Sequence, residues 1–475
     1  MKATHLFLKK IGILSIATLL IAGCTSDPQK QDEPTPPSPE IPEESEEPEE
    51  PVDDLTAFFY KHMNGETALW SDSEPISADQ IVAKREEVWN LWKKACESYN
   101  EEKLIALNPL GSNSTGRWKL PANLEPNATM PYYWGTKGTE PADGYPLFLY
   151  LHGSGDKDSE WITGLNICSG FDDAPSAYFI PQIPNTGNYY RWWQKAKQFA
   201  WEKLLRLAFA SGKIDPDRVY FFGISEGGYG SQRLASFYAD YLAGAGPMAG
   251  GEPLKNAPVE NCRNIAFSLR TGANDNGFFR NTLTQYTKDE FDRLQSANPG
   301  SFEHNIQLIP GMGHGIDYSP TTPWLKNYTR DPYPKTVSWE NFEMDGLYRD
   351  GFYNLYINER SNNDANSRSY YEMSITGNAI TLNVQTVKYQ TTETNSGIDM
   401  KFAKTYTPAT KGKITVYLSP ELVDMAQPVT LTVNGKTAFN DNVGLDTKHL
   451  INSCGIFFDP ERLYPAAIEV DLSAL

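Results

Sequence analysis

The chain has 475 residues, of which 60 are acidic and 42 are Lys or Arg, so its formal net charge is −18. That length is too great for one ordinary domain and predicts two or three. An acidic chain lacks the basic face that nucleic-acid phosphates require, which excludes nucleic acid as a partner.

The N-terminus resembles the export signal of a bacterial lipoprotein. Lysines precede an apolar run from Ile11 to Ala22, which predicts a secretory signal over residues 1–23 that is too short to span a membrane. The run ends in Leu-Ile-Ala-Gly-Cys, which resembles a lipobox and implies that Cys24 is lipidated. The alternative is an ordinary cleaved signal. The resemblance implies a surface-exposed outer-membrane lipoprotein that contacts the membrane through its lipid anchor only.

The composition of residues 24–54 predicts a disordered tether. Residues 27–54 hold twelve Asp or Glu against one Lys, with many prolines and few large apolar side chains. Such a segment cannot bury a core, and its charge and prolines keep it extended.

Residues 55–335 predict an α/β domain with an N-terminal helical extension. The extension is an amphipathic helix over residues 76–100, with a capping box at Ser77 and Gln80. Apolar strand patterns then alternate with helical patterns: strands at 145–155, 176–182, 217–223, 264–272 and 304–311, and helices at 191–212 and 283–297. This alternation predicts a mostly parallel sheet flanked by helices.

Residues 336–475 predict a C-terminal antiparallel β domain of sandwich type. The segment has β-branched alternation and an Asn-Gly turn at Asn434 and Gly435. Outside Cys24 the four cysteines are widely spaced, which favours free, buried thiols over a disulfide framework. No zinc-type cluster of Cys and His occurs in the sequence, so neither a metal nor a cofactor is expected.

A serine lies between glycines directly after an apolar strand pattern. Gly223, Ser225 and Gly227 form a G-x-S-x-G motif, and the following residues can be helical. A strand that turns sharply into a helix needs glycine at both flanks and leaves the serine side chain exposed at the apex. Ser225 is therefore the candidate nucleophile.

A nucleophilic serine needs a base and an acid that orients the base. His314 lies in a glycine-rich loop after an apolar strand, and Asp275 ends a strand-end loop between Ser225 and His314. The order Ser, acid, His is expected on this type of sheet. Competing acids are Asp317, Asp289 and Asp292.

Two backbone N–H groups are candidates for an oxyanion hole. One belongs to Glu226, directly after the nucleophile, and the other to the His-Gly-Ser-Gly loop at Ser154 or its neighbours Gly153 and Gly155. His152 is expected to shape this loop.

These motifs, in this order, resemble the α/β-hydrolase superfamily over about residues 130–330. Within it the chain is similar to bacterial esterases grouped with esterase D, polyhydroxybutyrate depolymerases and feruloyl esterases. The resemblance implies a serine carboxylesterase in which Ser225 forms an acyl-enzyme, His314 moves the proton and Asp275 orients His314.

Aromatic and basic residues near the predicted strand ends are candidates for substrate binding: Tyr190, Trp192, Trp193, Phe278 and Arg280. They either stack on a sugar ring or aromatic acyl group, or pack in the core. The expected partner is a small-molecule or oligosaccharide ester. The alternatives are a serine peptidase of the same fold, and a glycan-binding surface protein on an inactive scaffold.

Overall fold

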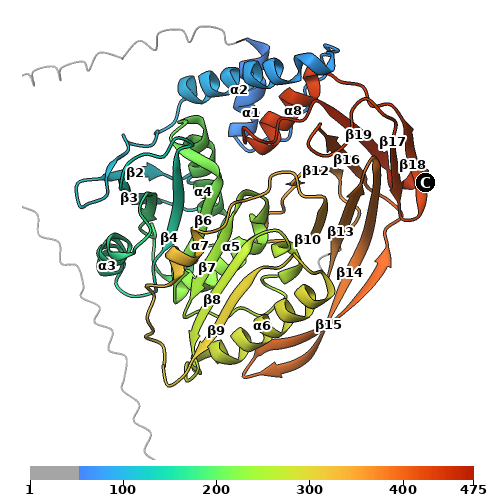
Figure 1. Ribbon diagram of the computed structural model, residues 1–475. Coiled ribbons are helices and arrows are strands. Elements are labelled where there is room, and N and C mark those ends of the chain that lie inside the picture. Colours follow the sequence, from blue (N-terminus) through green and yellow to red (C-terminus); the bar gives the residue numbers. More distant parts are fainter. Residues whose placement is uncertain (1–52, 365) are drawn as a thin grey trace, which may run out of the picture. The chain divides into compact units, whose positions relative to one another are not determined.

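The computed structural model describes residues 53–475 except residue 365, and these belong to one compact unit (Figure 1). The predicted signal, the lipidation site at Cys24 and nearly all of the tether lie outside the described residues. Helix α1 (Asp54–Met63) starts at the last residue assigned to the tether, and Asp53 caps it by accepting the N–H of Thr56. Within the described chain, no helix is both long and apolar enough to cross a membrane.

A nine-stranded sheet forms the centre of the molecule. Its strands run in the order β1-β3-β5-β4-β6-β7-β8-β9, with β2 also paired to β3. The six strands from β5 to β9 in this order are parallel to one another, whereas β3 is antiparallel to both β2 and β5. The strands are β1 (Asn108–Pro109), β2 (Thr115–Lys119), β3 (Thr129–Lys137), β4 (Tyr145–Leu151), β5 (Ser176–Pro181), β6 (Ile214–Ile224), β7 (Gly244–Met248), β8 (Ala266–Gly272) and β9 (His304–Ile309).

Helices cover both faces of this sheet, and β4 shows why. Its side chains alternate in direction, so that Leu147 and Leu149 join one buried cluster while Phe148 and Tyr150 join another. The first cluster also holds residues of α4 (Lys195–Ala210), α5 (Glu226–Phe237) and α6 (Arg280–Ala297). The second holds residues of α3 (Lys157–Gly170) and α7 (Thr321–Leu325). The predicted α/β class, with a mostly parallel sheet between helices, is confirmed.

The C-terminal segment forms two further sheets. A six-stranded sheet has the order β10-β13-β14-β17-β18 with β15 paired to β14, and a four-stranded sheet has the order β11-β12-β16-β19. Pairing is antiparallel as predicted, apart from the parallel pair β14 and β17. The two sheets meet where Trp339 stacks on Phe352 at 5.2 Å between ring centroids. The strands are β10 (Thr336–Asn341), β11 (Gly351–Phe352), β12 (Leu355–Glu359), β13 (Ser367–Thr376), β14 (Ala379–Asn395), β15 (Ile398–Pro408), β16 (Lys413–Leu418), β17 (Val429–Val433), β18 (Lys436–Asp441) and β19 (Ala466–Asp471).

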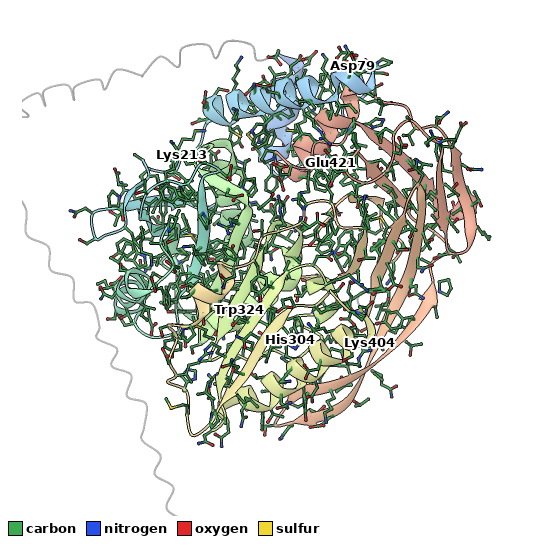
Figure 2. All side chains as sticks on the ribbon, viewed as in Figure 1. Asp79, Lys213, His304, Trp324, Lys404 and Glu421 are labelled. Atoms are coloured by element: carbon green, nitrogen blue, oxygen red, sulfur yellow. The ribbon has the colours of Figure 1, made fainter. Side chains whose placement is uncertain are left out.

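Three helices gather at one end of the molecule: α1, α2 (Ile81–Ser98) and α8 (Thr447–Phe457). They share a small apolar core. The predicted capping box is present at Ser77 and Gln80, directly before α2. Figure 2 shows Glu421 beneath α2, where it accepts two hydrogen bonds from Arg85. All four cysteines in the described chain are buried and free, as predicted: Cys96, Cys168, Cys262 and Cys454.

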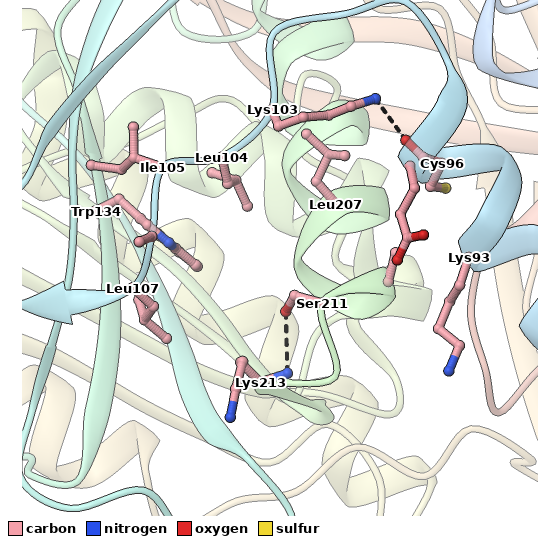
Figure 3. Close-up of a pocket in the computed structure, with 13 residues that line it drawn as sticks. Lys93, Cys96, Lys103, Leu104, Ile105, Leu107, Trp134, Leu207, Ser211 and Lys213 are labelled. Atoms are coloured by element: carbon pink, nitrogen blue, oxygen red, sulfur yellow. Dashed lines mark hydrogen bonds between the residues drawn. The ribbon is translucent and has the colours of Figure 1, made fainter.

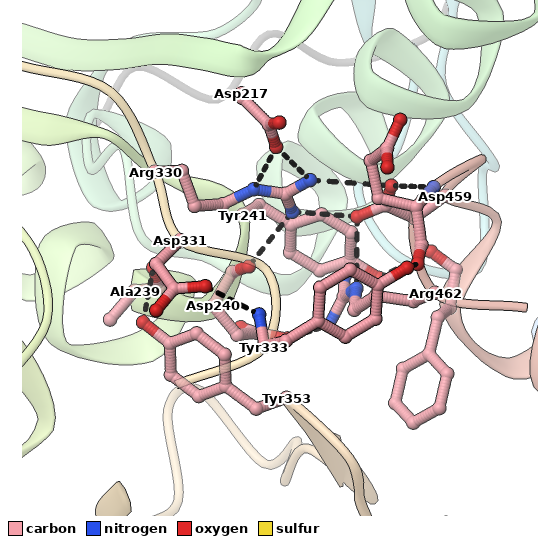
Figure 4. Close-up of polar contacts among 12 residues, drawn as sticks. Asp217, Ala239, Asp240, Tyr241, Arg330, Asp331, Tyr333, Tyr353, Asp459 and Arg462 are labelled. Atoms are coloured by element: carbon pink, nitrogen blue, oxygen red, sulfur yellow. Dashed lines mark hydrogen bonds and ion pairs between the residues drawn. The ribbon is translucent and has the colours of Figure 1, made fainter. Parts of the chain in front are cut away.

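A buried ionic network fastens the C-terminal segment to the central sheet (Figure 4). Arg330 lies 2.8 Å from Asp217 on β6 and 2.6 Å from Asp459. Arg462 lies 2.9 Å from Asp459 and 2.6 Å from Asp240, which follows α5. Removing one partner of such a network leaves an uncompensated buried charge, which costs about 3–5 kcal/mol. The network therefore fixes how residues after α8 sit against the sheet that carries the candidate site.

Candidate active site

The turn between β6 and α5 has the strained geometry predicted for G-x-S-x-G. Ser225 has φ 58° and ψ −112°, a conformation that non-glycine residues rarely adopt. Its N–H donates to the carbonyl of Met248 at 3.0 Å. A Cβ on Gly227 would lie 1.9 Å from the carbonyl oxygen of Leu151, and one on Gly223 would lie 2.5 Å from the carbonyl oxygen of Gly227. Both glycines are required by this close approach of backbone to backbone.

Ser225, His314 and Asp275 form one hydrogen-bonded chain. The Oγ of Ser225 lies 3.0 Å from Nε2 of His314, and Nδ1 of His314 lies 2.7 Å from Oδ2 of Asp275. The three come from the turn after β6, the loop after β9 and the loop after β8, so neighbouring parallel strands bring them to the same edge of the sheet. A mostly parallel sheet between helices, with a strained serine turn after a central strand and then the acid and the histidine on later strand-end loops, is characteristic of one fold. It is the α/β-hydrolase fold.

The competing acids make other bonds. The carboxylate of Asp317 accepts the N–H of Ser319 at 3.0 Å. Asp292 contacts Lys288 and His304, and Asp289 accepts from the Gln285 side chain. Asp275 is the acid that contacts His314, and only 3% of its surface is exposed. Its other oxygen, Oδ1, accepts from Nη1 of Arg280 at 3.1 Å.

Hydrogen bonds made by His152, the first residue of the loop at residues 152–155, and by Tyr190 fix the conformation of this loop. Nε2 of His152 accepts the N–H of Ile183 at 3.1 Å, so Nδ1 carries the proton and donates to the Gly153 carbonyl at 2.7 Å. The hydroxyl of Tyr190 donates to the same carbonyl, also at 2.7 Å. Burial lowers the pKa of His152 to about 4, which keeps its ring neutral. His152 therefore shapes the loop, as expected.

The hydrogen bonds to the Gly153 carbonyl also set the direction of the Ser154 N–H, which belongs to the same peptide group. In a trans peptide the C=O and N–H point in opposite directions. Because the Gly153 carbonyl points down to Tyr190, the N–H of Ser154 points away from it, on a loop where a Cβ at Gly153 would lie 3.5 Å from Cβ of Ser225. The N–H of Glu226 begins α5, and the first N–H groups of a helix have no partner within it. The predicted donors at Ser154 and Glu226 thus both lie next to the nucleophile.

Two of the residues expected to bind substrate have internal roles instead. Trp192 has no exposed surface, and its Nε1 donates to the carbonyl of His152 at 2.9 Å. Tyr190 keeps 7% of its surface exposed and uses its hydroxyl on the loop. The core-packing alternative therefore holds for these two rings, because both extend inward beneath the loop rather than outward. Sequence reasoning missed that they support the candidate oxyanion hole.

The other three expected substrate contacts differ in exposure. Phe278 is 68% exposed. Trp193 is partly buried, with the Arg233 guanidinium 3.9 Å from its ring centroid. Arg280 is 9% exposed and pairs with Asp275, so it holds the acid rather than facing solvent.

A separate hollow of about 380 Å³ lies away from these residues (Figure 3). Its lining includes the apolar side chains of Leu104, Ile105 and Trp134, together with several lysines. One of them, Lys213, directly precedes β6, whereas Ser225 directly follows β6. The hollow is therefore at the opposite end of this strand from the triad.

Comparison with known proteins gives a short stretch of similarity to one curated protein. No protein-family model matches the chain. The protein named "Putative esterase NocK" from Nocardia uniformis subsp. tsuyamanensis is 30% identical over 134 residues, which is 25% of this chain and 36% of that protein. The chain thus spans about a third of the length of the curated relative that it matches.

Solved structures with similarity to the chain include esterases. A thermostable esterase is 20% identical, with 46% of this chain and 64% of that chain covered and a TM-score of 0.36. A CE1 ferulic acid esterase from the anaerobic fungus Anaeromyces mucronatus is 14% identical, with 48% and 93% covered and a TM-score of 0.33. At these identities and TM-scores the similarity carries no information about the substrate of this chain.

Proposed function

We propose that the protein is an exported serine carboxylesterase, anchored by a lipid on Cys24, that removes acyl groups from carbohydrate esters. The observation that carries the enzymatic part is the hydrogen-bonded chain from Ser225 through His314 to Asp275, at a serine whose backbone is strained. Strain of this kind persists where function requires it, and three side chains in these roles would serve no purpose in a binding module.

In the proposed reaction Ser225 attacks the ester carbonyl while Nε2 of His314 takes the hydroxyl proton. The bond from Oγ to the acyl carbon forms, the bond from that carbon to the alcohol oxygen breaks, and His314 gives its proton to the leaving alcohol. Water then attacks the acyl-enzyme with His314 again as base, which releases the carboxylic acid and restores Ser225. The N–H groups of Glu226 and Ser154 stabilise the negative oxygen that develops in each half-reaction.

The experiment that tests the enzymatic proposal is labelling of the full-length protein with a fluorophosphonate, followed by mass spectrometry of the modified peptide. Labelling at Ser225 together with hydrolysis of 4-nitrophenyl acetate is the expected result. Faster cleavage of peptide amides than of esters would favour the peptidase. A folded protein that is neither labelled nor active would favour the glycan-binding alternative. Membrane fractionation of wild type and Cys24→Ala tests the anchor separately.

Tyr190→Phe is expected to lower kcat for ester hydrolysis about tenfold with a smaller change in KM. The variant keeps the ring but removes the hydroxyl that holds the Gly153 carbonyl, so the Ser154 N–H is less well aimed. Complete loss of one oxyanion donor costs about 10²- to 10³-fold, and a loosened donor costs less. Steady-state kinetics check this, with Tyr189→Phe as the control on the neighbouring ring, which is 36% exposed. Equal kcat values in the two variants would contradict the anchoring role.

A further inference from the structure

The carboxyl group of Glu226, the residue directly after the nucleophile, lacks the hydrogen-bond donors that buried carboxylates normally have. Its side chain is 11% exposed, and its Oε1 is sealed from solvent with no hydrogen-bond partner in the described part of the chain. The nearest cation is Arg191, whose Nη1 lies 3.6 Å from that oxygen, too far for a hydrogen bond. By contrast, neighbouring Glu252 accepts two hydrogen bonds from Arg233, at 2.6 and 3.1 Å.

A buried carboxyl oxygen without a hydrogen-bond donor destabilises the protein unless a ligand supplies the donor. Desolvation raises the pKa of Glu226 to about 7, with Arg191 as the main opposing charge and Glu252, Arg233 and Arg280 as further charged neighbours. A buried polar group without a partner costs about 1–3 kcal/mol. The 11% of the Glu226 side chain that stays exposed is the part that a ligand can reach, and a turn of the carboxyl group toward a ligand hydroxyl would give it the missing donor.

Arg191 offers the complementary donors at the same place. Its side chain is 46% exposed, and its guanidinium donates to the Tyr190 carbonyl at 2.6 Å, the one hydrogen bond it makes within the described chain. A guanidinium has five N–H donors, so others are available. A hydroxyl group donates one hydrogen bond and accepts up to two. It is thus the group that suits a carboxyl and a guanidinium lying side by side.

Arg280, a charged neighbour of Glu226, also contacts an exposed aromatic ring. Phe278 follows the triad acid Asp275, is 68% exposed, and contacts Arg280, whose guanidinium lies 5.2 Å from its ring centroid. The backbones of Phe278 and Phe279 are both left-handed, with φ of 51° and 59°. Each such residue costs of order 1–3 kcal/mol and persists only where the surroundings enforce it. The surroundings therefore enforce a backbone that leaves a large apolar ring exposed next to Arg280, the partner of the triad acid.

We propose that Glu226, Arg191 and Phe278 form a subsite for the sugar ring whose hydroxyl is esterified. Glu226 and Arg191 bind neighbouring hydroxyl groups of the sugar, and Phe278 covers an apolar face of its ring. The subsite holds the alcohol part rather than the acyl part, because Arg191 and Phe278 are open to solvent and leave room for a longer saccharide. This inference rests on the proposed esterase function and goes beyond it by naming the residues that select the alcohol.

The test compares two acetyl esters that differ only in the alcohol: an acetylated methyl xyloside and 4-nitrophenyl acetate. We measure kcat/KM for both with wild type, Glu226→Met and Phe278→Ala, using the full-length protein. Glu226→Met keeps the size and the helix-forming tendency of the side chain but removes its acceptors. Asp289→Asn, an exposed carboxyl on α6, is the matched control.

The expected result is that the ratio of kcat/KM for the sugar ester to that for the nitrophenyl ester falls about 10-fold or more in both variants and stays constant in the control. Wild type that hydrolyses 4-nitrophenyl acetate but not the xyloside, or an unchanged ratio in both folded variants, would overturn the subsite while leaving the esterase intact. Wild type that hydrolyses neither ester would instead overturn the proposed function. Thermal unfolding of each variant identifies one that fails to fold, in which case Glu226→Leu, which also lacks acceptors, and Phe278→Asn, which suits the left-handed backbone, replace it.

Discussion

Ser225→Ala is expected to lower kcat for ester hydrolysis by roughly 10⁴-fold or more while the protein stays folded. The hydroxyl is the only part removed, and it is the group 3.0 Å from Nε2 of His314. Alanine has the same Cβ as serine, so the strained backbone of the turn faces no new contact. Kinetics with 4-nitrophenyl acetate, fluorophosphonate labelling and thermal unfolding check the three parts of this expectation.

Ser296→Ala is the matched control for this variant, because Ser296 is exposed on α6 and its hydroxyl donates to the carbonyl of Asp292 within the same helix. Its activity and labelling should equal those of wild type. Activity of Ser225→Ala near that of the control would remove Ser225 from the role of nucleophile.

The sequence predicts the turn at Ser225 well because local physics decides it. An apolar strand, small residues at positions where a Cβ would strike backbone, and a helix-compatible segment are all visible within about twenty residues. The same holds for the capping box at Ser77 and Gln80, and for the turn at Asn434 and Gly435, where both residues have positive φ. Features that depend only on neighbouring residues are therefore predicted correctly from the sequence.

The local sequence does not predict the elements that form because of contacts with residues far away along the chain. Strand β7, Gly244–Met248, begins with two glycines around an alanine and then a proline, which all have little β propensity, and it is a strand because β6 and β8 flank it. A Cβ on Gly246 would lie 2.6 Å from the Thr321 side chain, so α7 requires the small residue there. Helix α8, in a segment that otherwise alternates as strands, is stabilised by its contact with α1 and α2.

The roles of side chains at the site likewise divide into those that the sequence predicts and those that depend on distant contacts. The order of Ser225, Asp275 and His314 identifies the triad, since the fold brings the ends of these strands together. The hydrogen bond from Tyr190 to Gly153 spans 37 residues, and nothing near Tyr190 in the sequence distinguishes an inward ring from an outward one. Arg280 likewise looks like a substrate contact until its ion pair with Asp275 is known.

Asp275→Asn is expected to cost about 10³- to 10⁴-fold in kcat, whereas Asp317→Asn should change kcat less than threefold. An amide at residue 275 either donates toward Nδ1 of His314, which stabilises the wrong tautomer, or accepts without the charge that stabilises the imidazolium. The carboxylate of Asp317 accepts only from Ser319 in the described chain, so its replacement leaves His314 untouched.

Loss of Asp275 also leaves Arg280 without its carboxylate, so a fall in activity must be separated from a fall in stability. Asp275→Asn and Arg280→Gln both break this ion pair, and each should lower the unfolding temperature. Only Asp275→Asn also removes the group that orients His314, so kcat should fall far more in it than in Arg280→Gln. Equal losses of kcat in these two variants would mean that the ion pair itself, rather than the orientation of His314, limits the rate. A larger loss in Asp317→Asn than in Asp275→Asn would assign the acid to Asp317, and that result would require the loop after β9 to rearrange around His314.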